Sequence, residues 1–255
     1  MAMKSIVKIL VLALFLGPFA GLKAQSLLKD SVMGVWMISA HYSYQLPFGD
    51  MAERFGGNSA LGGMLGFKNG KNWMYGIEGS YLFGNNVKDL GQLENISLGS
   101  NVLIRTDGRI ESVFLAERGF TVQGFLGKMI AFKKPNVNSG IVLKLGVGAL
   151  RHKIRLIGDK EYIPQITGGY EKGYDRLTSG ILLAPFIGYQ FMSTSRLLNF
   201  YGGIEFNLAF TKGRRAWNFD QNGPADARRT DMLVGFKGGW IITKYVAYTE
   251  KYYYY

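Results

Sequence analysis

The chain has no cysteine, and it is short of proline and of long apolar runs. Its 255 residues include 6 Pro and no Cys. The lack of cysteine excludes disulfide crosslinks and thiolate metal sites, and we expect neither a metal nor a cofactor. Beyond residue 24 no apolar run reaches about 18 residues, the length that a transmembrane helix needs. A helical membrane span of the mature chain is therefore not expected.

The N-terminal segment 1–24 has the pattern of a signal peptide. Lys4 and Lys8 precede an apolar core at 9–16, and the pair Ala24-Gln25 supplies a cleavage site. The alternative is an uncleaved membrane anchor, for which the apolar core is short. Because no cysteine follows the leader, a lipoprotein anchor has no acceptor. We expect an exported chain that folds without crosslinks.

The residues that are abundant point to strands. Glycine is plentiful at 35 residues and aromatics make up 14% of the chain, which suits curved strands with aromatic girdles at membrane interfaces. Segment 198–210 alternates at every second residue. Phe200, Ile204 and Phe206 share one face, and Glu205 and Asn207 share the other. A period of two predicts a strand with one apolar face.

Seven more segments follow the same rule. The predicted strands cover residues 32–45, 60–68, 72–84, 120–132, 140–154, 180–191, 198–210 and 231–245. Their connections are alternately long and short, as in an outer-membrane barrel with short periplasmic turns and longer extracellular loops. An open sheet edge would leave backbone groups unsatisfied in hydrocarbon, so the sheet must close. The predicted fold class is all-β, an eight-stranded antiparallel transmembrane β-barrel.

Three local features qualify this pattern. Within the long connection after the third strand, 101–115 is predicted to form a further hairpin that turns at Asp107-Gly108. Pro185 lies inside the sixth strand, where it removes a ladder donor, and a β-bulge would resolve the conflict. Lys128 falls on an apolar face, where we expect it to snorkel towards the membrane edge.

Two soluble architectures could also produce alternating strands. A soluble sandwich would not require the regular alternation of loop lengths, and a lipocalin-like barrel would turn its apolar set inward. The membrane barrel accounts for both features. We therefore expect a signal peptide at 1–24, an outer-membrane barrel at 25–245 and an aromatic periplasmic tail at 246–255.

The mature chain resembles the small eight-stranded outer-membrane barrel proteins of OmpA/OmpX-like architecture, in the form common in Bacteroidota. The resemblance covers the full barrel and is mostly architectural. It rests on Ala24-Gln25, segment 67–83, Gly173-Tyr174-Asp175-Arg176-Leu177-Thr178, Gly188-Tyr189-Gln190, segment 199–206 and the aromatic tail. That group includes barrels associated with the type IX secretion apparatus, such as PorG and PorT. The chain departs from many such barrels in continuing beyond its last strand.

Four charged residues are predicted to face the barrel interior near the middle of their strands. An eight-stranded barrel has room for side chains but not for a water-filled pore. Buried charges persist when they are paired and hydrogen-bonded. We predict an ion-pair plug, and a gated narrow conduit is the alternative. The four residues are Glu78, Lys144, Glu205 and Lys237.

The long loops hold a basic group that flanks an aromatic residue. Arginine forks match phosphate geometry, so this group could bind lipopolysaccharide phosphates or an acidic partner. A solvated loop face balanced by Asp220, Asp226 and Asp231 is the alternative. The net charge of +12 would also suit nucleic acid, but we expect no such partner outside the cell interior. The group is Arg214, Arg215, Trp217, Arg228 and Arg229.

Enzymatic activity is not expected. Outer-membrane lipid hydrolases use Ser and His with an acidic or amide partner, and the chain has only His41 and His152. No nucleophile motif accompanies either. The predicted function is a non-enzymatic scaffold or subunit of an envelope complex, and the resemblance adds secretion as its setting. A free-standing adhesion barrel is the alternative, followed by a small conduit or a lipid-modifying enzyme.

Overall fold

The computed structural model describes residues 34–99, 101–132, 137–193, 198–225 and 227–245. The predicted signal peptide at 1–24 and tail at 246–255 lie outside these residues. The barrel strands are β1 (Val35–Gly49), β2 (Asn58–Lys68), β3 (Trp73–Gly84), β6 (Phe114–Ala131), β7 (Gly140–Ile157), β8 (Thr178–Met192), β9 (Asn199–Gly213) and β10 (Arg228–Tyr245).

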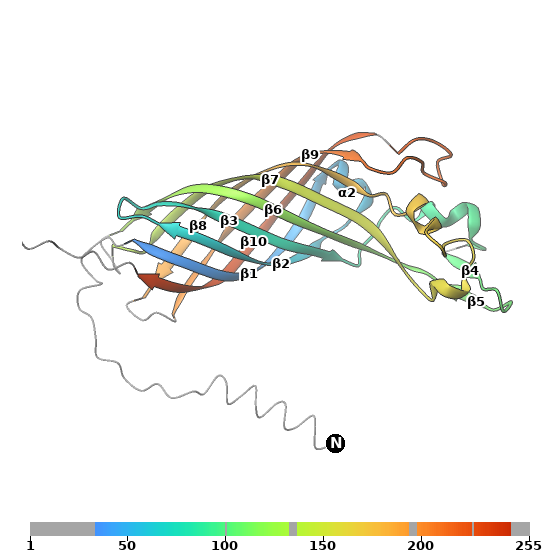
Figure 1. Ribbon diagram of the computed structural model, residues 1–255, viewed down its shortest axis with the longest axis horizontal. Coiled ribbons are helices and arrows are strands. Elements are labelled where there is room, and N and C mark those ends of the chain that lie inside the picture. The colour runs from blue at the N-terminus through green and yellow to red at the C-terminus, as the bar shows by residue number, and fades with distance from the viewer. Residues whose placement is uncertain (1–33, 100, 133–136, 194–197, 226, 246–255) are drawn as a thin grey trace, which may run out of the picture.

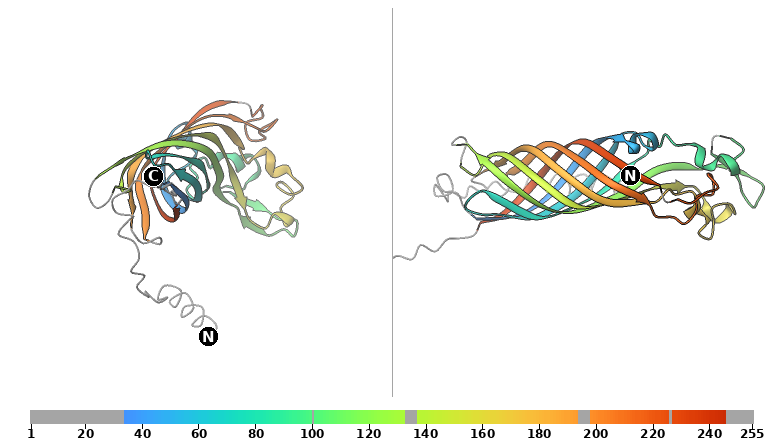
Figure 2. Two further views of the ribbon diagram at one scale, coloured as in Figure 1. Left: turned by 60° about the vertical axis from the view of Figure 1, so that its left-hand side comes forward. Right: turned by 90° about the horizontal axis from the view of Figure 1, so that it is seen from above.

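These eight strands form one closed antiparallel ring in the order β1-β10-β9-β8-β7-β6-β3-β2 (Figures 1 and 2). Pairing of β1 with β10, from Val35 opposite Tyr245 to Gly49 opposite Asp231, closes the sheet. Short connections join β2 to β3, β6 to β7 and β8 to β9, whereas the other connections are long. The predicted fold class is confirmed. We call the two ends of the barrel the short-turn end and the long-loop end.

The outer wall of the barrel is apolar and uncovered. Ile38, Leu61 and Ile181 keep 59, 59 and 64% of their surface exposed, while Met37 and Leu182 beside them in sequence are buried. The same alternation runs along every barrel strand. An apolar surface that encircles a molecule is unstable in water, but it matches acyl chains. The wall is therefore the surface of a membrane-spanning barrel.

Aromatic side chains gather on this wall at the short-turn end. The Trp36 and Phe67 rings lie 5.1 Å apart and the Phe191 and Phe200 rings 5.0 Å apart. Lys128 donates from Nζ to the Lys71 carbonyl at 2.8 Å, and its Nζ lies 4.9 Å from the centre of the Trp73 ring. Lys128 thus extends to the end of its strand, as a snorkelling lysine does.

Several strands are longer than the sequence pattern predicts. β6, β7 and β10 each have 18 residues, although about 9–11 suffice to cross a bilayer. β6 begins at Phe114, which pairs with Ile157 at the end of β7. The start predicted at Phe120 is therefore wrong, because the alternation continues through charged residues beyond the apolar belt.

The additional hairpin is present but shorter than predicted. β4 (Val102–Ile104) pairs with β5 (Ile110–Ser112). The turn lies at Asp107-Gly108, where Gly108 has φ 79°, a backbone conformation that glycine adopts at little cost. The predicted range 101–115 is too long because the residues from Phe114 onward belong to β6.

Pro185 does not cause the predicted bulge. β8 pairs with β9 at Leu183 opposite Leu208 and again at Phe186 opposite Glu205, which is the same register on both sides of the proline. Pairing is interrupted at Ala184 and Pro185 and then resumes. The lost donor is accommodated by this gap in the ladder, and the bulge prediction is wrong.

The long connections fold into an ordered lobe at one end (Figure 1). We call residues 85–99, 101–113 and 158–177 the loop lobe. It contains β4, β5, η2 (Gly91–Ile96), η3 (Lys160–Tyr162) and η4 (Tyr170–Gly173), while α2 (Asp50–Arg54) follows β1. Leu93, Leu103 and Ile163 of the lobe are fully buried in a cluster that continues into the barrel at Leu150 and Leu182. None of the helices in the described part of the chain is long and apolar enough to cross a membrane.

A charge on the outer wall should destabilise the barrel in lipid. Leu145 is the central one of the outward-facing residues between Ile141 and Ala149 of β7 and is 52% exposed. Leu145→Arg is expected to lower the free energy of unfolding by about 2–4 kcal/mol, as arginine does at a bilayer midplane. Ile110→Arg, at the 69% exposed Ile110 of β5, should change it by less than about 0.5 kcal/mol. Urea unfolding in lipid vesicles measures both, and equal losses would contradict a membrane-facing wall.

Candidate functional site

The four charged residues predicted to face inward meet in the lumen. Lys144 Nζ lies 3.1 Å from Glu78 Oε2, and Lys237 Nζ lies 2.5 Å from Glu78 Oε1. Lys237 also pairs with Glu205. All four side chains are at most 6% exposed. Because they come from β3, β7, β9 and β10, the ion pairs form a chain that crosses the lumen.

Two glutamines extend this chain. Gln123 donates from Nε2 to Glu78 Oε1 at 3.2 Å, and Gln45 donates from Nε2 to Glu205 Oε1 at 2.7 Å. With two carboxylates and two ammonium groups the chain is electrically balanced. Buried ions persist only when such partners compensate for their lost hydration. Gln45 and Gln123 were not among the residues predicted for this site, although the alternation along β1 and β6 places both inside.

Apolar and aromatic side chains fill the lumen between these charges and the short-turn end. Lys144 Nζ lies 4.7 Å from the centre of the Phe186 ring and 5.3 Å from that of Tyr201. A buried cluster rich in methionine, including Met37, Met74 and Met129, continues towards the short-turn end. The hollow beside Lys144, Phe186 and Tyr201 has no room for a water molecule.

Two glycines make this packing possible. A Cβ on Gly146 would lie 2.5 Å from Gln123 Oε1, and one on Gly239 would lie 2.5 Å from the Tyr201 ring. Any larger residue would push these side chains away from the wall. The glycines let Gln123 and Tyr201 lie flat against the inner face of the sheet.

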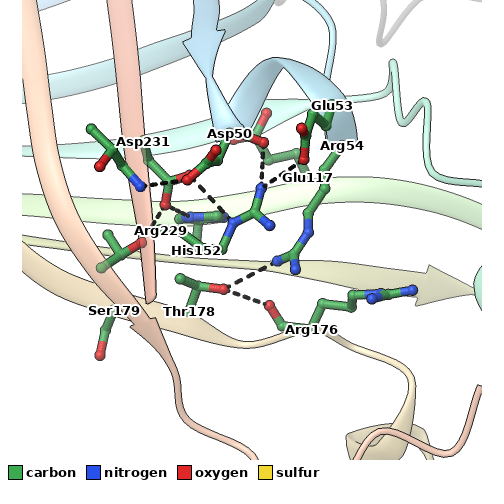
Figure 3. A network of polar contacts seen from close by, with 12 residues as sticks. Asp50, Glu53, Arg54, Glu117, His152, Arg176, Thr178, Ser179, Arg229 and Asp231 are labelled. Atoms are coloured by element: carbon green, nitrogen blue, oxygen red, sulfur yellow. Dashed lines mark hydrogen bonds and ion pairs between the residues drawn. The ribbon is translucent and has the colours of Figure 1, made fainter. Parts of the chain in front are cut away.

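A second polar network lies inside the long-loop end (Figure 3). His152 Nε2 lies 3.0 Å from Asp231 Oδ2, and Thr211 donates from Oγ1 to the same oxygen at 2.5 Å. Arg229 also approaches Asp231, with its Nε 3.7 Å from Oδ1. Glu117 accepts from Asn58 Nδ2 at 3.0 and 3.2 Å. Asp231 faces inward by parity, which was the signal available in the sequence.

Helix α2 is tied to this network and to the start of β10. Arg229 donates to the Asp50 carbonyl, and the Thr230 backbone N–H donates to Asp50 Oδ2 at 2.6 Å. Arg54 donates to Thr178 Oγ1 at 3.4 Å (Figure 3). Met51 of the same helix is fully buried. The helix therefore packs onto the barrel at the long-loop end.

The two histidines lie in different polar surroundings. His41 Nε2 lies 2.8 Å from Ser80 Oγ, but its Nδ1 has no hydrogen-bond partner among the described residues. A serine–histidine pair without a group that orients the imidazole lacks part of the hydrolase arrangement. His152 is 1% exposed and lies against Asp231. In the described ranges no three His, Asp or Glu side chains are placed to hold a metal ion.

The five basic and aromatic loop residues predicted as one group have different contacts in the structure. Arg215 forms two hydrogen bonds to Asp175, and Arg229 points towards α2. Arg214 donates from Nε to Ser179 Oγ at 2.7 Å. Trp217 and Arg228 are exposed. Arg215 and Arg229 are therefore held by intramolecular hydrogen bonds, and Arg214, Arg228 and Arg229 line one hollow. Binding of an anion by this group stays a prediction.

Electrostatics in the loops reflect these pairs. The hydrogen bonds to Asp175 raise the pKa of Arg215 above its usual range. Burial raises the pKa of Asp220, although its pairing with Arg176 acts in the opposite direction. Asp220 was predicted to balance the arginines of its own loop. In the structure it pairs with Arg176 instead. Residue 226, a second predicted counter-charge, lies outside the described residues.

Fold and lumen together define a closed, filled eight-stranded barrel.

No protein-family model matches the sequence, and the comparison with curated proteins found no match. Among solved structures it is similar to Ail, the attachment invasion locus protein of Yersinia pestis, in complex with the heparin analogue sucrose octasulfate, at 11% identity and TM-score 0.38, over 82% of this chain and 99% of that one.

Two proteins of Pseudomonas aeruginosa are similar to the same degree. The outer membrane protein OprG matches at 9% identity and TM-score 0.40, over 84% of this chain and 98% of its own. The N-terminal β-barrel domain of OprF matches at 8% identity and TM-score 0.37, over 81% of this chain and 97% of its own. These similarities concern the ring of eight antiparallel strands.

Removing the central lysine should leave two buried carboxylates short of a partner. Lys237→Met is expected to lower the free energy of unfolding by about 3–5 kcal/mol. The double variant Glu205→Gln with Lys237→Met should lose less, because Glu78 retains Lys144 and Gln123 and no charge remains at Glu205. Urea unfolding in vesicles measures both variants. A double variant at least as unstable as the single one would contradict the ion-pair chain.

The filled lumen predicts that the barrel does not conduct. Purified protein in a planar bilayer should show no steady current, because the ion-pair chain and the methionine-rich cluster leave no continuous water path. The measurement is single-channel recording across a range of voltages. A large, steady conductance in the unmodified protein would contradict the plug and support the conduit.

Proposed function

We propose that the protein is a non-enzymatic barrel of the outer membrane that serves as a scaffold or subunit of an envelope complex, with the long-loop end outside the cell. The observation that carries this proposal is an ordered loop lobe with apolar side chains on its surface, standing over a lumen that is closed. A closed lumen favours contacts over transport. The sequence resemblance makes a type IX secretion apparatus the first complex to test.

The wall of the barrel supports the location. Its apolar belt and aromatic girdle match the outer face of a membrane barrel. Short turns at one end and long loops at the other are the arrangement of barrels whose loops face outward. The leader predicted at 1–24 is consistent with export.

The loop lobe is held in a defined shape. Arg105 pairs with Glu111 at 2.9 Å and with Asp159 at 3.4 Å, and it lies 4.5 Å from the centre of the Tyr162 ring. A hydrogen bond from the Asp159 backbone lowers the pKa of Glu111, with Arg105 adding to the effect. The β4–β5 hairpin is thereby joined to segment 158–162. A shaped lobe can bind a partner without first paying to become ordered.

Apolar side chains on the lobe and the adjoining strand ends are exposed in pairs. Ile104 and Ile110 lie opposite each other in β4 and β5 and are 44 and 69% exposed. Phe114 and Ile157 lie opposite each other at the ends of β6 and β7 and are 69 and 40% exposed. Exposed apolar surface above the membrane commonly marks a protein contact.

Co-purification in mild detergent from the native host tests this function. Wild-type protein should retain an envelope protein in fixed stoichiometry. Ile110→Glu with Phe114→Glu should abolish that retention while the free energy of unfolding stays within about 1 kcal/mol, because both side chains are exposed. The control is Trp217→Glu, which charges an aromatic of another loop that is 45% exposed and should retain the partner.

Two outcomes would overturn the proposal. If wild-type protein carries no partner yet binds host surfaces, the free-standing adhesion barrel is favoured. If Trp217→Glu releases the partner and the lobe variant does not, the contact lies on the β9–β10 loop and the lobe has no part in it.

A further inference from the structure

A row of cationic side chains crosses the outer wall at the long-loop end. In register across four neighbouring strands lie Arg151 of β7, Ser179 of β8, Lys212 of β9 and Arg228 of β10. Arg214 donates to Ser179 and supplies the cation at that strand. Arg151, Lys212 and Arg228 are exposed. Strands lie about 4.8 Å apart, so the row spans about 14 Å.

The row lies directly above the apolar belt. One step of two residues towards the membrane, the same four strands carry Ala149, Ile181, Phe210 and Thr230, again in register. Ile181 and Phe210 are 64 and 56% exposed. A two-residue step along a strand covers about 7 Å. The wall therefore changes from hydrocarbon to cations within the depth of a lipid headgroup.

Further cations continue the row along β6 and β7. Arg118 and Lys153 lie opposite each other, and Arg155 follows one step further out. Arg118 donates to the Gly84 carbonyl at 3.1 Å, and Lys153 Nζ lies 3.7 Å from Asp175 Oδ2. These three residues line a hollow of about 530 Å³ together with Arg151. A second hollow, of about 570 Å³, is lined by Lys212, Arg214 and Arg228. We call the seven cations the cationic rim.

Few acids oppose the cationic rim. Glu171 lines the first hollow and Asp50 the second, and Asp175 is already bound to Arg215. Within the described residues the side chains of Arg151, Arg155 and Arg228 form no hydrogen bond or ion pair. At the short-turn end, the outward-facing cations of the barrel strands are Lys128 and Lys244. Among the described outward-facing residues of the barrel strands, the excess of positive charge therefore belongs to the long-loop end.

We propose that the cationic rim binds the phosphate groups of lipopolysaccharide in the outer leaflet. A cation that faces sideways just above an acyl-chain belt meets headgroups of the surrounding lipid and not solutes above the membrane. Guanidinium groups hold phosphate oxygens through paired hydrogen bonds. The belt below the rim contacts the acyl chains of the same lipid. This site differs from the loop group predicted from sequence, because it adds cations of β6 and β7 and does not include Trp217. Arg215 and Arg229 also line the two hollows, but they are hydrogen-bonded to Asp175 and to the Asp50 carbonyl.

Full-length protein titrated with bisphosphorylated lipid A and followed by native mass spectrometry tests the site. Each cation near a lipid surface strengthens attraction to anionic lipid about fivefold. Arg151→Gln with Arg228→Gln is therefore expected to weaken lipid A binding about 25-fold. Arg109→Gln, which removes an exposed arginine near the β4–β5 turn, should leave binding unchanged. Equal unfolding midpoints for the three proteins would show that the folds are intact.

Two additional arms distinguish the ligand. Dephosphorylated lipid A should bind the wild type as weakly as lipid A binds the double variant. Inorganic phosphate should not displace lipid A, since the belt contributes to binding. The proposal is overturned if the double variant binds lipid A like the wild type, if dephosphorylated lipid A binds equally well, or if inorganic phosphate competes fully.

Discussion

The structure depends on the need to pair every backbone polar group inside a hydrocarbon layer. An isolated sheet edge would leave a row of N–H and C=O groups without partners there, at a cost of several kcal/mol for each group. Pairing of β1 with β10 removes that edge. Closure then imposes two consequences on the sequence: the outward residues must suit acyl chains, and the inward residues must fill a narrow lumen.

Charged side chains occupy part of the lumen in which apolar side chains would also have fitted. A buried ion pair is weak support for stability, since a well-packed apolar replacement is often at least as stable. A role in specificity accounts better for Glu78, Lys144, Glu205 and Lys237. They come from four different strands, and a one-residue slip of any strand would turn its charge into the lipid. The ion-pair chain therefore penalises wrong registers more strongly than it stabilises the right one.

The period of two was enough to predict the ring of eight strands and the inward placement of Lys144 and Glu205. Pairings between distant strands could not be read from the sequence, because register and rotamer decide that Lys237 contacts both glutamates. The same limit applies to the loops. The hydrogen bonds that join Arg215 to Asp175 and Arg229 to α2 could not be read from the sequence. The bulge at Pro185 was predicted from the missing backbone donor alone. Whether the neighbouring strand tolerates that missing donor depends on the whole sheet and cannot be read from the local sequence.

The native tryptophans provide the most direct test of the outer wall. Trp36, Trp73 and Trp240 face outward near the short-turn end and are 48, 43 and 52% exposed, while Trp217 lies in a loop. A Trp217→Phe variant, reconstituted in vesicles whose acyl chains carry bromine, reports on those three alone. Strong fluorescence quenching, greatest for bromine near the headgroup end of the chain, is the result expected of a membrane-spanning barrel. Fluorescence that brominated lipid leaves unchanged, together with quenching by a water-soluble ion, would contradict it.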